Sequence, residues 1–388
     1  MNYAQTLNKL PPYLFDAIDK IKAQKEAEGH ILDSLSIGDP DLDAPAFVLD
    51  TLIQSIRISE NQKYPSYAGK PAFRQAVANW YKRIFGVTCD PATEIIGLLG
   101  SKEGLAHAPL AFLNPGDGVL VPNPGYPVYG SATLFAGGVP LLFQLKEENH
   151  FLPDFSELEF LIKKHPAPVK MLFLNYPNNP TGATATLAFF HDVVSFARKH
   201  NLIVCHDNAY SEIYFDGKRQ PSFLEVPGAM DIGCEFHSLS KTFNMTGFRV
   251  GFLVGNKDIV AGILKVKTNT DSGICNALQD AAVTALTQGD AFCQTLRERY
   301  TARRNILTPA LQACSCLQLM PTDATFYLWC KITSGLSSSD FVMHLIEKAG
   351  IITTPGSGFG SMGEGYVRLT LCKDETRLKN IAERIAAV

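Results

Sequence analysis

The sequence lacks an excess of charge of either sign. Lys and Arg number 35 against 38 Asp and Glu, so the formal net charge is −3, and no run of basic residues forms an arm. Because nucleic-acid binding depends on concentrated positive charge facing the phosphate backbone, we expect no nucleic-acid partner. A small acidic ligand stays open, because a single well-placed arginine can hold a carboxylate or a phosphate.

Long hydrophobic runs and metal-ligand spacings are also absent. No stretch of about 18 or more apolar residues occurs, so we expect no membrane-spanning helix. The first residues contain no long apolar segment, so we expect no signal peptide. The nine cysteines form no CxxC pair, and only Cys314 and Cys316 lie close together. This pattern favours free thiols in a reducing cytoplasm and indicates no metal site.

Hydrophobic residues make up 46% of the 388 residues, enough to bury a large core. Short apolar runs bounded by Pro, Gly, Asn or Asp are typical of strands. Such runs occur at 119–124, 169–177, 202–210 and 249–255, and helical patterns occur at 15–29, 71–86 and 184–200. Strands that alternate with helices predict an α/β fold with a mostly parallel sheet covered on both faces.

The pattern changes beyond about residue 270. We expect one long helix over 276–312, then strands near 316–321 and 325–332, a helix at 338–349 and a final strand at 366–372. Strands with helices on one side are typical of a smaller α+β domain. We therefore predict an N-terminal arm and part of the small domain in 1–45, a large domain in 46–275, and the rest of the small domain in 276–388.

Chemistry is expected beyond the carboxyl ends of the parallel strands, where ligands bind in open α/β sheets. Lys241 follows the run CEFHSLS. Burial at a strand end favours the neutral amine, which is a nucleophile for aldehydes. Ser238, Ser240 and Arg249 lie in the same short segment, and their hydroxyls and guanidinium suit a phosphate.

Asp207 ends the apolar run LIVCHDNAY. A carboxylate at that place is costly unless it is paired. A protonated pyridine nitrogen would be a good partner, and the pairing would keep the ring an electron sink. The alternative interpretation is a helix N-cap, a position that Asp favours. Tyr210, three residues later, would place a phenol beside the same ring.

Three loops complete the candidate set. Asn179, in NNPTG, has an amide that suits a phenolate oxygen, although an ordinary turn fits as well. Ser101 and Lys102, in GSKEG, precede an apolar helix, where backbone N–H groups bind phosphate; an N-cap role for Ser101 is also open. Tyr126, in VPNPGYPVY, suits stacking on a flat cofactor or filling the core.

Taken together, the segments NNPTG, HDNAYSEI, SLSKTFNMTGFRVG and YVRLTL resemble the class I/II aminotransferases, which are pyridoxal-phosphate enzymes of fold type I. The resemblance covers nearly the whole chain. It implies that Lys241 binds pyridoxal 5′-phosphate as a Schiff base and moves a proton between Cα and C4′. It also implies that Asp207 pairs with the pyridine nitrogen, and that Asn179 and Tyr210 bond to the phenolate oxygen.

The same resemblance implies the rest of the site. At the cofactor phosphate it places Ser101, Lys102, Ser238, Ser240 and Arg249, with Tyr126 stacked on the ring. Arg368 would bind the substrate α-carboxylate, with Gly38 touching it through its backbone and Asn179 beside it. The segment KYPSYAGKPAFR matches a stretch in which a tyrosine reaches the partner subunit's phosphate. Tyr64 is the predicted residue, with Tyr67 as the alternative, and a homodimer with shared active sites follows.

The implied reaction transfers an amino group from an L-amino acid to an oxo acid, with 2-oxoglutarate as the expected acceptor. The segments KLPPYLFDAIDKIKA, SIGDPDLDAP, GSKEGLAH and VPNPGYPVY are most similar to the diaminopimelate branch of the family, which serves lysine biosynthesis. Branches that act on alanine, aspartate or N-succinyl-diaminopimelate share much of this sequence and stay open. The alternative of another class is a pyridoxal-phosphate C–S β-lyase, which would use the same lysine.

Overall fold

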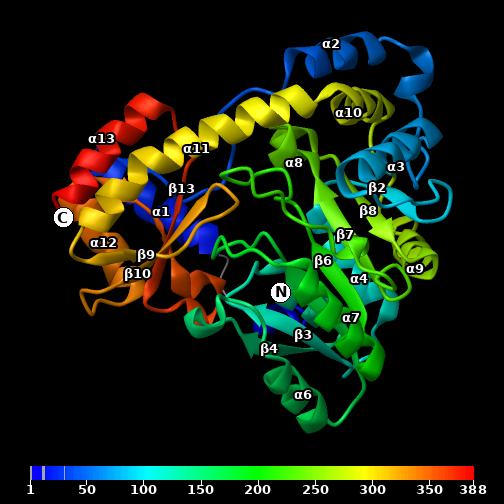
Figure 1. The fold of residues 1–388 in the computed structure, drawn as a ribbon, viewed down its shortest axis with the longest axis horizontal. Helices are drawn as coiled ribbons and strands as arrows, with labels where there is room; N and C mark the ends of the chain where they lie inside the picture. The colour runs from blue at the N-terminus through cyan, green and yellow to red at the C-terminus, as the bar shows by residue number, and fades with distance from the viewer. Residues whose placement is uncertain (1, 11–13, 30) are drawn as a thin grey trace.

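A computed structural model of the chain describes residues 2–10, 14–29 and 31–388, and its centre is a seven-stranded sheet (Figure 1). The strand order is β2-β8-β7-β6-β5-β3-β4. The strands are β2 (Ile95–Leu98), β3 (Gly118–Asn123), β4 (Val139–Gln144), β5 (Val169–Asn175), β6 (Ile203–Asp207), β7 (Gly233–Ser238) and β8 (Gly251–Gly255). Strand β8 runs opposite to the other six strands. The predicted α/β fold with a mostly parallel sheet is confirmed.

Both faces of this sheet are buried, because successive residues of a strand point to opposite sides. In β5, Met171 and Phe173 belong to one core cluster, whereas Leu172 and Leu174 belong to the other. The first cluster includes residues of α4 (Ser101–Phe112), α5 (Val128–Phe135) and α9 (Lys257–Lys267). The second includes residues of α3 (Pro71–Phe85), α6 (Phe155–Lys164) and α7 (Leu187–His200). Burial on both faces explains why the strands are nearly continuous apolar runs.

A second assembly lies beside the large sheet, at the left of Figure 1. Its four-stranded antiparallel sheet has the order β12 (Thr354–Pro355), β13 (Tyr366–Thr370), β10 (Tyr327–Ile332) and β9 (Leu317–Leu319). A two-stranded parallel pair joins β1 (Asp33–Ser34) to β11 (Ile351–Ile352), and so brings the N-terminal part of the chain here. The helices are α1 (Leu14–Ala27), α11 (Asp290–Ala313), α12 (Ser338–Ala349) and α13 (Glu375–Ala386). The predicted domain boundaries stay a prediction.

Several predicted helix ends are confirmed. Helix α3 begins at Pro71 and ends at Gly86, whose φ of 72° is the left-handed conformation that glycine adopts readily. Helix α12 spans the predicted 338–349, and α7 starts three residues later than predicted, after the N-cap Thr186. None of the described helices is long and apolar enough to cross a membrane.

The single helix predicted over 276–312 is wrong. The chain instead forms α10 (Asn276–Gln288) and α11, which meet at Gly289. A Cβ at Gly289 would overlap the Phe243 ring and the Ala285 carbonyl, so only glycine fits at this position. Helix α10 packs against α2 (Ala46–Ser55) and α3, whereas α11 runs to α13. The apolar periodicity continues across the break because both helices bury one face, so the sequence pattern conceals it.

Candidate active site

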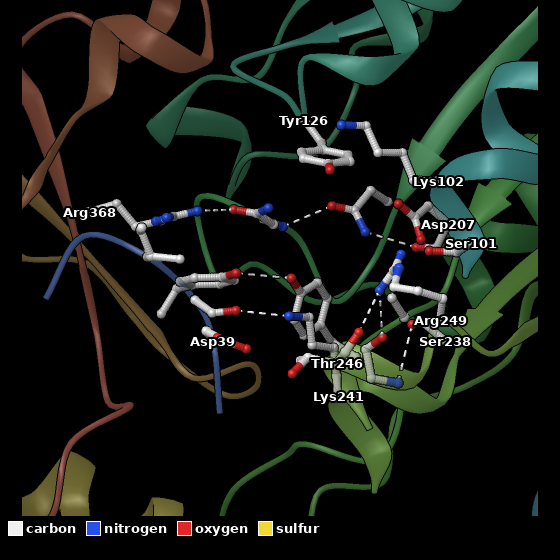
Figure 2. Close-up of a pocket in the computed structure, with 18 residues that line it drawn as sticks. Asp39, Ser101, Lys102, Tyr126, Asp207, Ser238, Lys241, Thr246, Arg249 and Arg368 are labelled. Carbon is white, nitrogen blue, oxygen red and sulfur yellow. Dashed lines mark hydrogen bonds between the residues drawn. The ribbon is translucent and has the colours of Figure 1, made fainter. Parts of the chain in front are cut away.

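A cavity of about 280 Å³ opens beyond the carboxyl ends of β5, β6 and β7 (Figure 2). These three neighbouring strands end in Asn175, Asp207 and Ser238, all of which line the cavity. Every predicted site residue except Tyr64 lines it as well. They are Gly38, Ser101, Lys102, Tyr126, Asn179, Asp207, Tyr210, Ser238, Ser240, Lys241, Arg249 and Arg368.

Lys241 is presented by α8 (Leu239–Thr242), a one-turn helix that follows β7. Ser238 caps this helix, because its hydroxyl accepts a hydrogen bond from the Ser240 N–H at 3.3 Å. The Lys241 ammonium donates to the Gly38 carbonyl at 2.8 Å. Burial lowers the pKa of Lys241, because the cavity wall solvates the charged form poorly. The geometry therefore supplies an amine that loses its proton more easily than a surface lysine does.

Asp207 is buried at the end of β6, and its two carboxylate oxygens differ. Oδ2 accepts a hydrogen bond from the Tyr129 hydroxyl at 2.8 Å, whereas Oδ1 has no hydrogen-bond partner among the described residues. Burial raises the pKa of Asp207 to about 6, and the bond from Tyr129 opposes that rise. A turn follows Asp207, so the N-cap alternative is excluded. The remaining oxygen suits a cationic donor from a ligand.

The loop after β5 is fixed by Asn175. Its amide oxygen accepts from the Asn179 N–H at 2.8 Å, and its NH₂ group donates to the Asp207 carbonyl at 2.8 Å. Asn178 also stabilises this loop, because its side-chain oxygen accepts hydrogen bonds from the Thr181 N–H and hydroxyl. The bonds made by Asn175 hold the Asn179 backbone and the Asp207 strand end in one arrangement.

Arg368, on β13, comes to the cavity from the second assembly. Its guanidinium donates to Asn179 Oδ1 at 2.7 Å and to the Ser36 carbonyl at 2.6 Å. The group lies 4.1 Å above the centre of the Tyr327 ring. The bond to Oδ1 leaves the Asn179 NH₂ group as the donor toward other oxygen atoms. A planar guanidinium held in this way suits bidentate binding of a carboxylate.

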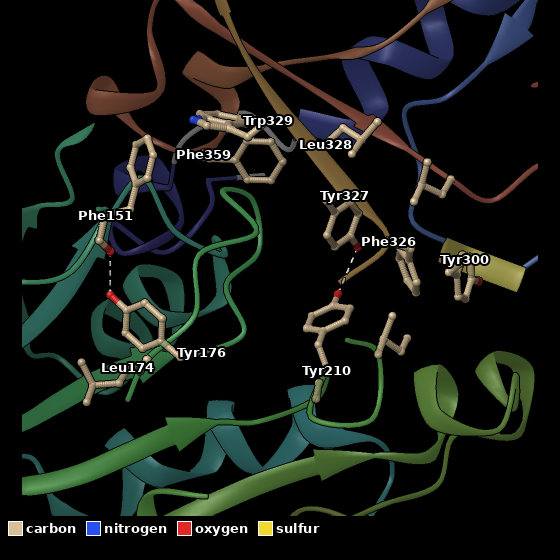
Figure 3. Packing of buried hydrophobic residues seen from close by; sticks show 14 of the residues in the cluster. Phe151, Leu174, Tyr176, Tyr210, Tyr300, Phe326, Tyr327, Leu328, Trp329 and Phe359 are labelled. Atoms are coloured by element: carbon tan, nitrogen blue, oxygen red, sulfur yellow. Dashed lines mark hydrogen bonds between the residues drawn. The ribbon is translucent and has the colours of Figure 1, made fainter. Parts of the chain in front are cut away.

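Tyr327 connects the two sheets at the cavity, as Figure 3 shows. Its hydroxyl lies 3.0 Å from that of Tyr210, and the neighbouring Phe326 packs between Tyr210 and Tyr300. A Cβ at Gly38 would overlap the Tyr327 hydroxyl, so the loop carrying the Gly38 carbonyl can come this close only with glycine. Tyr327 therefore sets the distance between the Gly38 loop and Tyr210.

Arg249 forms hydrogen bonds to polar groups at another side of the cavity. Its guanidinium donates to the Thr246 carbonyl at 2.8 Å and approaches the Ser240 hydroxyl at 3.4 Å. Burial, and then the charge of Arg249, lower the pKa of Lys102. Gly100 has a φ of 82° and leaves no room for a Cβ beside Arg249. Two cations and several hydroxyls on adjoining loops form a site suited to a dianion such as a phosphate.

Some cavity residues were not found from the sequence. Asn175 ends an apolar strand as Asp207 does, and that position is the sequence signal that could have found it. Thr246 and Asp39 lie in segments that were singled out for their neighbours. Tyr129, which bonds to Asp207 without lining the cavity, ends the VPNPGYPVY segment that was singled out for Tyr126. Tyr327 has no signal in the sequence, because strand aromatics are more often core residues.

Tyr64 does not line the cavity, and its side chain is 90% exposed. Tyr67, the alternative, is 44% exposed. Exposure fits a residue that serves another subunit, and the role stays a prediction.

The family profile "Aminotransferase class I and II" matches residues 32–385. An LL-diaminopimelate aminotransferase of Nitratidesulfovibrio vulgaris strain DP4 is 51% identical over 384 residues, which cover 99% of this chain and 98% of that protein. One from Aquifex aeolicus is 50% identical with the same coverage. The substrate-bound BacF structure from Bacillus subtilis has a TM-score of 0.94 and 34% identity, and the match covers 100% of this chain and 98% of that one.

Proposed function

The chain belongs to the class I and II aminotransferases, which are pyridoxal-phosphate enzymes of fold type I, and we propose that its cavity binds this cofactor and acts on LL-diaminopimelate. The observation that carries the cofactor assignment is the cavity itself, which joins the Lys241 amine to the Asp207 oxygen that has no hydrogen-bond partner in the described part of the chain. The substrate assignment rests on 51% identity, over nearly the full length, to enzymes that bear that name.

The residues fit the cofactor. When bound, pyridoxal phosphate supplies an aldehyde for the amino group and a ring that accepts the electron pair of the Cα–H bond. Asp207 Oδ1 would accept from the ring N–H, and the Asn179 NH₂ and Tyr210 hydroxyl would donate to the phenolate oxygen. Arg249, Lys102 and the nearby hydroxyls would hold the phosphate, and Tyr126 would stack on the ring. The carboxylate of Asp207 would favour the protonated form of the ring nitrogen.

The chain's own groups explain the proton transfer. In this proposal Lys241 Nζ is the base that removes the substrate Cα proton, because burial lets it lose its own proton more easily than a surface lysine does. The Gly38 carbonyl, at 2.8 Å, keeps this nitrogen directed into the cavity. The same amine returns the proton in the second half of the reaction, when an oxo acid, 2-oxoglutarate in our proposal, takes up the amino group.

Arg368 would orient the substrate by its α-carboxylate. We expect Arg368→Ala to raise KM for every α-amino acid substrate by about 100-fold, the loss typical of a charge-assisted pair of about 2–3 kcal/mol. Steady-state kinetics with the amino donor varied provide the measurement. Arg198→Ala is the matched control, because Arg198 pairs with Asp231 on the exposed surface. An unchanged KM for all donors in Arg368→Ala would exclude the role.

The substrate proposal is tested by a donor panel with 2-oxoglutarate as the acceptor. We expect LL-diaminopimelate to have the highest kcat/KM, above those of alanine, aspartate and N-succinyl-LL-diaminopimelate. A higher value for any of these three would transfer the assignment to that branch. Formation of pyruvate and ammonia from cystathionine without an oxo acid would favour the C–S β-lyase instead.

We also propose a homodimer in which Tyr64 reaches the partner subunit's phosphate site. Exposure of an aromatic side chain supports this proposal, because a tyrosine that is 90% exposed has its apolar ring in water unless a partner covers it. A cytoplasmic location and a place in lysine biosynthesis are consequences of the proposed substrate.

A further inference from the structure

A partly buried polar cluster lies at the first turns of α4, next to the residues that line the cavity. The Lys267 cluster consists of Glu103, His107, Lys267, Thr270 and Asp271. The Lys267 side chain is fully buried, and its ammonium donates to both Glu103 oxygens at 3.1 and 3.3 Å and to Asp271 Oδ1 at 2.8 Å. His107 extends the cluster, with Nδ1 3.2 Å from Glu103 Oε1 and Nε2 3.2 Å from the Thr270 hydroxyl.

The ammonium of Lys267 supplies the positive charge of this cluster. Ligand-type atoms of Glu103, His107 and Asp271 lie within 4.8 Å of one another, a spacing that would also suit a metal ion. Lys267 donates to both carboxylates, so it already provides a cation between them. Because two carboxylates this close repel each other when poorly hydrated, the arrangement depends on that cation.

One side of the cluster fixes the turn that leads into α4. Glu103 Oε2 accepts a hydrogen bond from the Leu99 N–H at 2.5 Å. Leu99 and Gly100 form the turn between β2 and α4, and Ser101 and Lys102, which line the cavity, follow directly. Movement of the Glu103 carboxylate would therefore shift the N–H groups at the start of α4, which the proposed function directs at the cofactor phosphate.

The other side fixes the segment that carries Tyr64 and Tyr67. Asp271 Oδ1 also accepts from the Gly273 N–H at 2.8 Å. A Cβ on Gly273 would come within 3.0 Å of the Ser66 carbonyl, and the Asn276 amide donates to the Lys63 carbonyl at 3.2 Å. The loop at 271–276 thus packs against residues 63–67. In the proposed dimer this segment points to the partner subunit's phosphate site.

We propose that Lys267 is a positioning residue for phosphate recognition, because its ammonium holds the Ser101 turn and the Tyr64 segment in a fixed relation. The inference rests on the proposed function, in which both segments serve a cofactor phosphate. Lys267 itself does not line the cavity, so it acts through Glu103 and Asp271 rather than by contact with the cofactor.

The test compares two ligands that differ only in the phosphate. Full-length Lys267→Met is stripped of cofactor and titrated with pyridoxal 5′-phosphate and with pyridoxal, and the dissociation constants are read from the visible absorbance. We expect the affinity for pyridoxal 5′-phosphate to fall by about tenfold or more, as when one charge-assisted hydrogen bond is misplaced. The affinity for pyridoxal is expected to stay within about twofold, because neither segment touches the ring.

Two further variants complete the experiment. Lys265→Met is the matched control, because Lys265 lies on the same helix but is exposed, and it is expected to leave both constants unchanged. If Lys267→Met does not fold, Glu103→Gln decides, because it keeps the side-chain shape and removes the charge that Lys267 pairs with. Equal losses of affinity for both ligands would show a merely structural role and overturn the proposal. No loss of affinity for either ligand would overturn it as well. Failure of the proposed function would appear separately, as a wild-type protein that does not bind pyridoxal 5′-phosphate.

Discussion

Lys241→Ala is expected to lose both the visible absorbance of the bound cofactor and transamination, with kcat lower by at least about 10⁴-fold. The amine has two tasks in the proposed reaction, because it binds the cofactor aldehyde and moves the Cα proton. Among the described residues the cavity is lined by one other lysine, Lys102, which lies with Arg249 at the proposed phosphate site. Absorbance spectra and single-turnover assays on the purified variant measure the two losses.

The matched control for this prediction is Lys102→Ala, because Lys102 is the other lysine that lines the cavity. That variant is expected to keep the absorbance and to bind the cofactor less tightly, because Lys102 lies with Arg249 at the proposed phosphate site. Normal turnover in Lys241→Ala, or loss of the absorbance in Lys102→Ala alone, would reverse the assignment of the two lysines.

Asp207→Asn is expected to lower kcat by roughly 10²–10³-fold while the protein still binds the cofactor. The amide has nearly the same shape but no charge, so it does not stabilise a protonated ring nitrogen. Tyr129→Phe is the graded comparison, because it removes only the hydrogen bond to Oδ2 and leaves the carboxylate in place. A smaller loss in Tyr129→Phe is expected, and equal kcat values for wild type and Asp207→Asn would contradict the pairing.

The same residue predicts a pH dependence of cofactor binding. Without a ring partner, burial raises the pKa of Asp207 from 3.8 to about 6. The folded state then keeps this proton longer than the unfolded state, so the contribution of Asp207 to stability falls as the pH rises from 3.8 to about 6. A bound ring cation reverses this loss by favouring the carboxylate. The rise in Tm on cofactor binding should therefore be larger at about pH 7 than at about pH 5, and Asp207→Asn should remove that difference.

Polar residues at strand ends made part of the site predictable from the sequence. Apolar runs with abrupt polar ends mark Asp207 and Ser238, and neighbouring parallel strands bring those ends to one edge of a sheet. Lys241 follows from the same edge, because the chain leaves β7 in a single helical turn. The roles given to these residues came from the resemblance to the aminotransferases, since residue types alone allowed an N-cap or a turn.

Other features depend on contacts between distant segments and leave no local pattern. Tyr327 reaches Tyr210 only because β10 packs over the end of the large sheet, and a strand aromatic looks like any core residue. Lys267 is the last residue of α9, and in the sequence it resembles a surface lysine. Its partner Glu103 is 164 residues away, so no local pattern reveals the pair. The break falls at Gly289, where contact with Phe243 leaves no room for a Cβ, and periodicity does not reveal such a contact.

Borohydride reduction of the cofactor-bound enzyme, followed by proteolysis and mass spectrometry, tests the central claim most directly. Reduction makes the bond between the cofactor and its lysine permanent, so the modified residue is read from the peptide. The account predicts a single modified peptide with the pyridoxyl phosphate on Lys241. Modification of Lys102 or of any other lysine, or no modified peptide from a cofactor-bound sample, would contradict it.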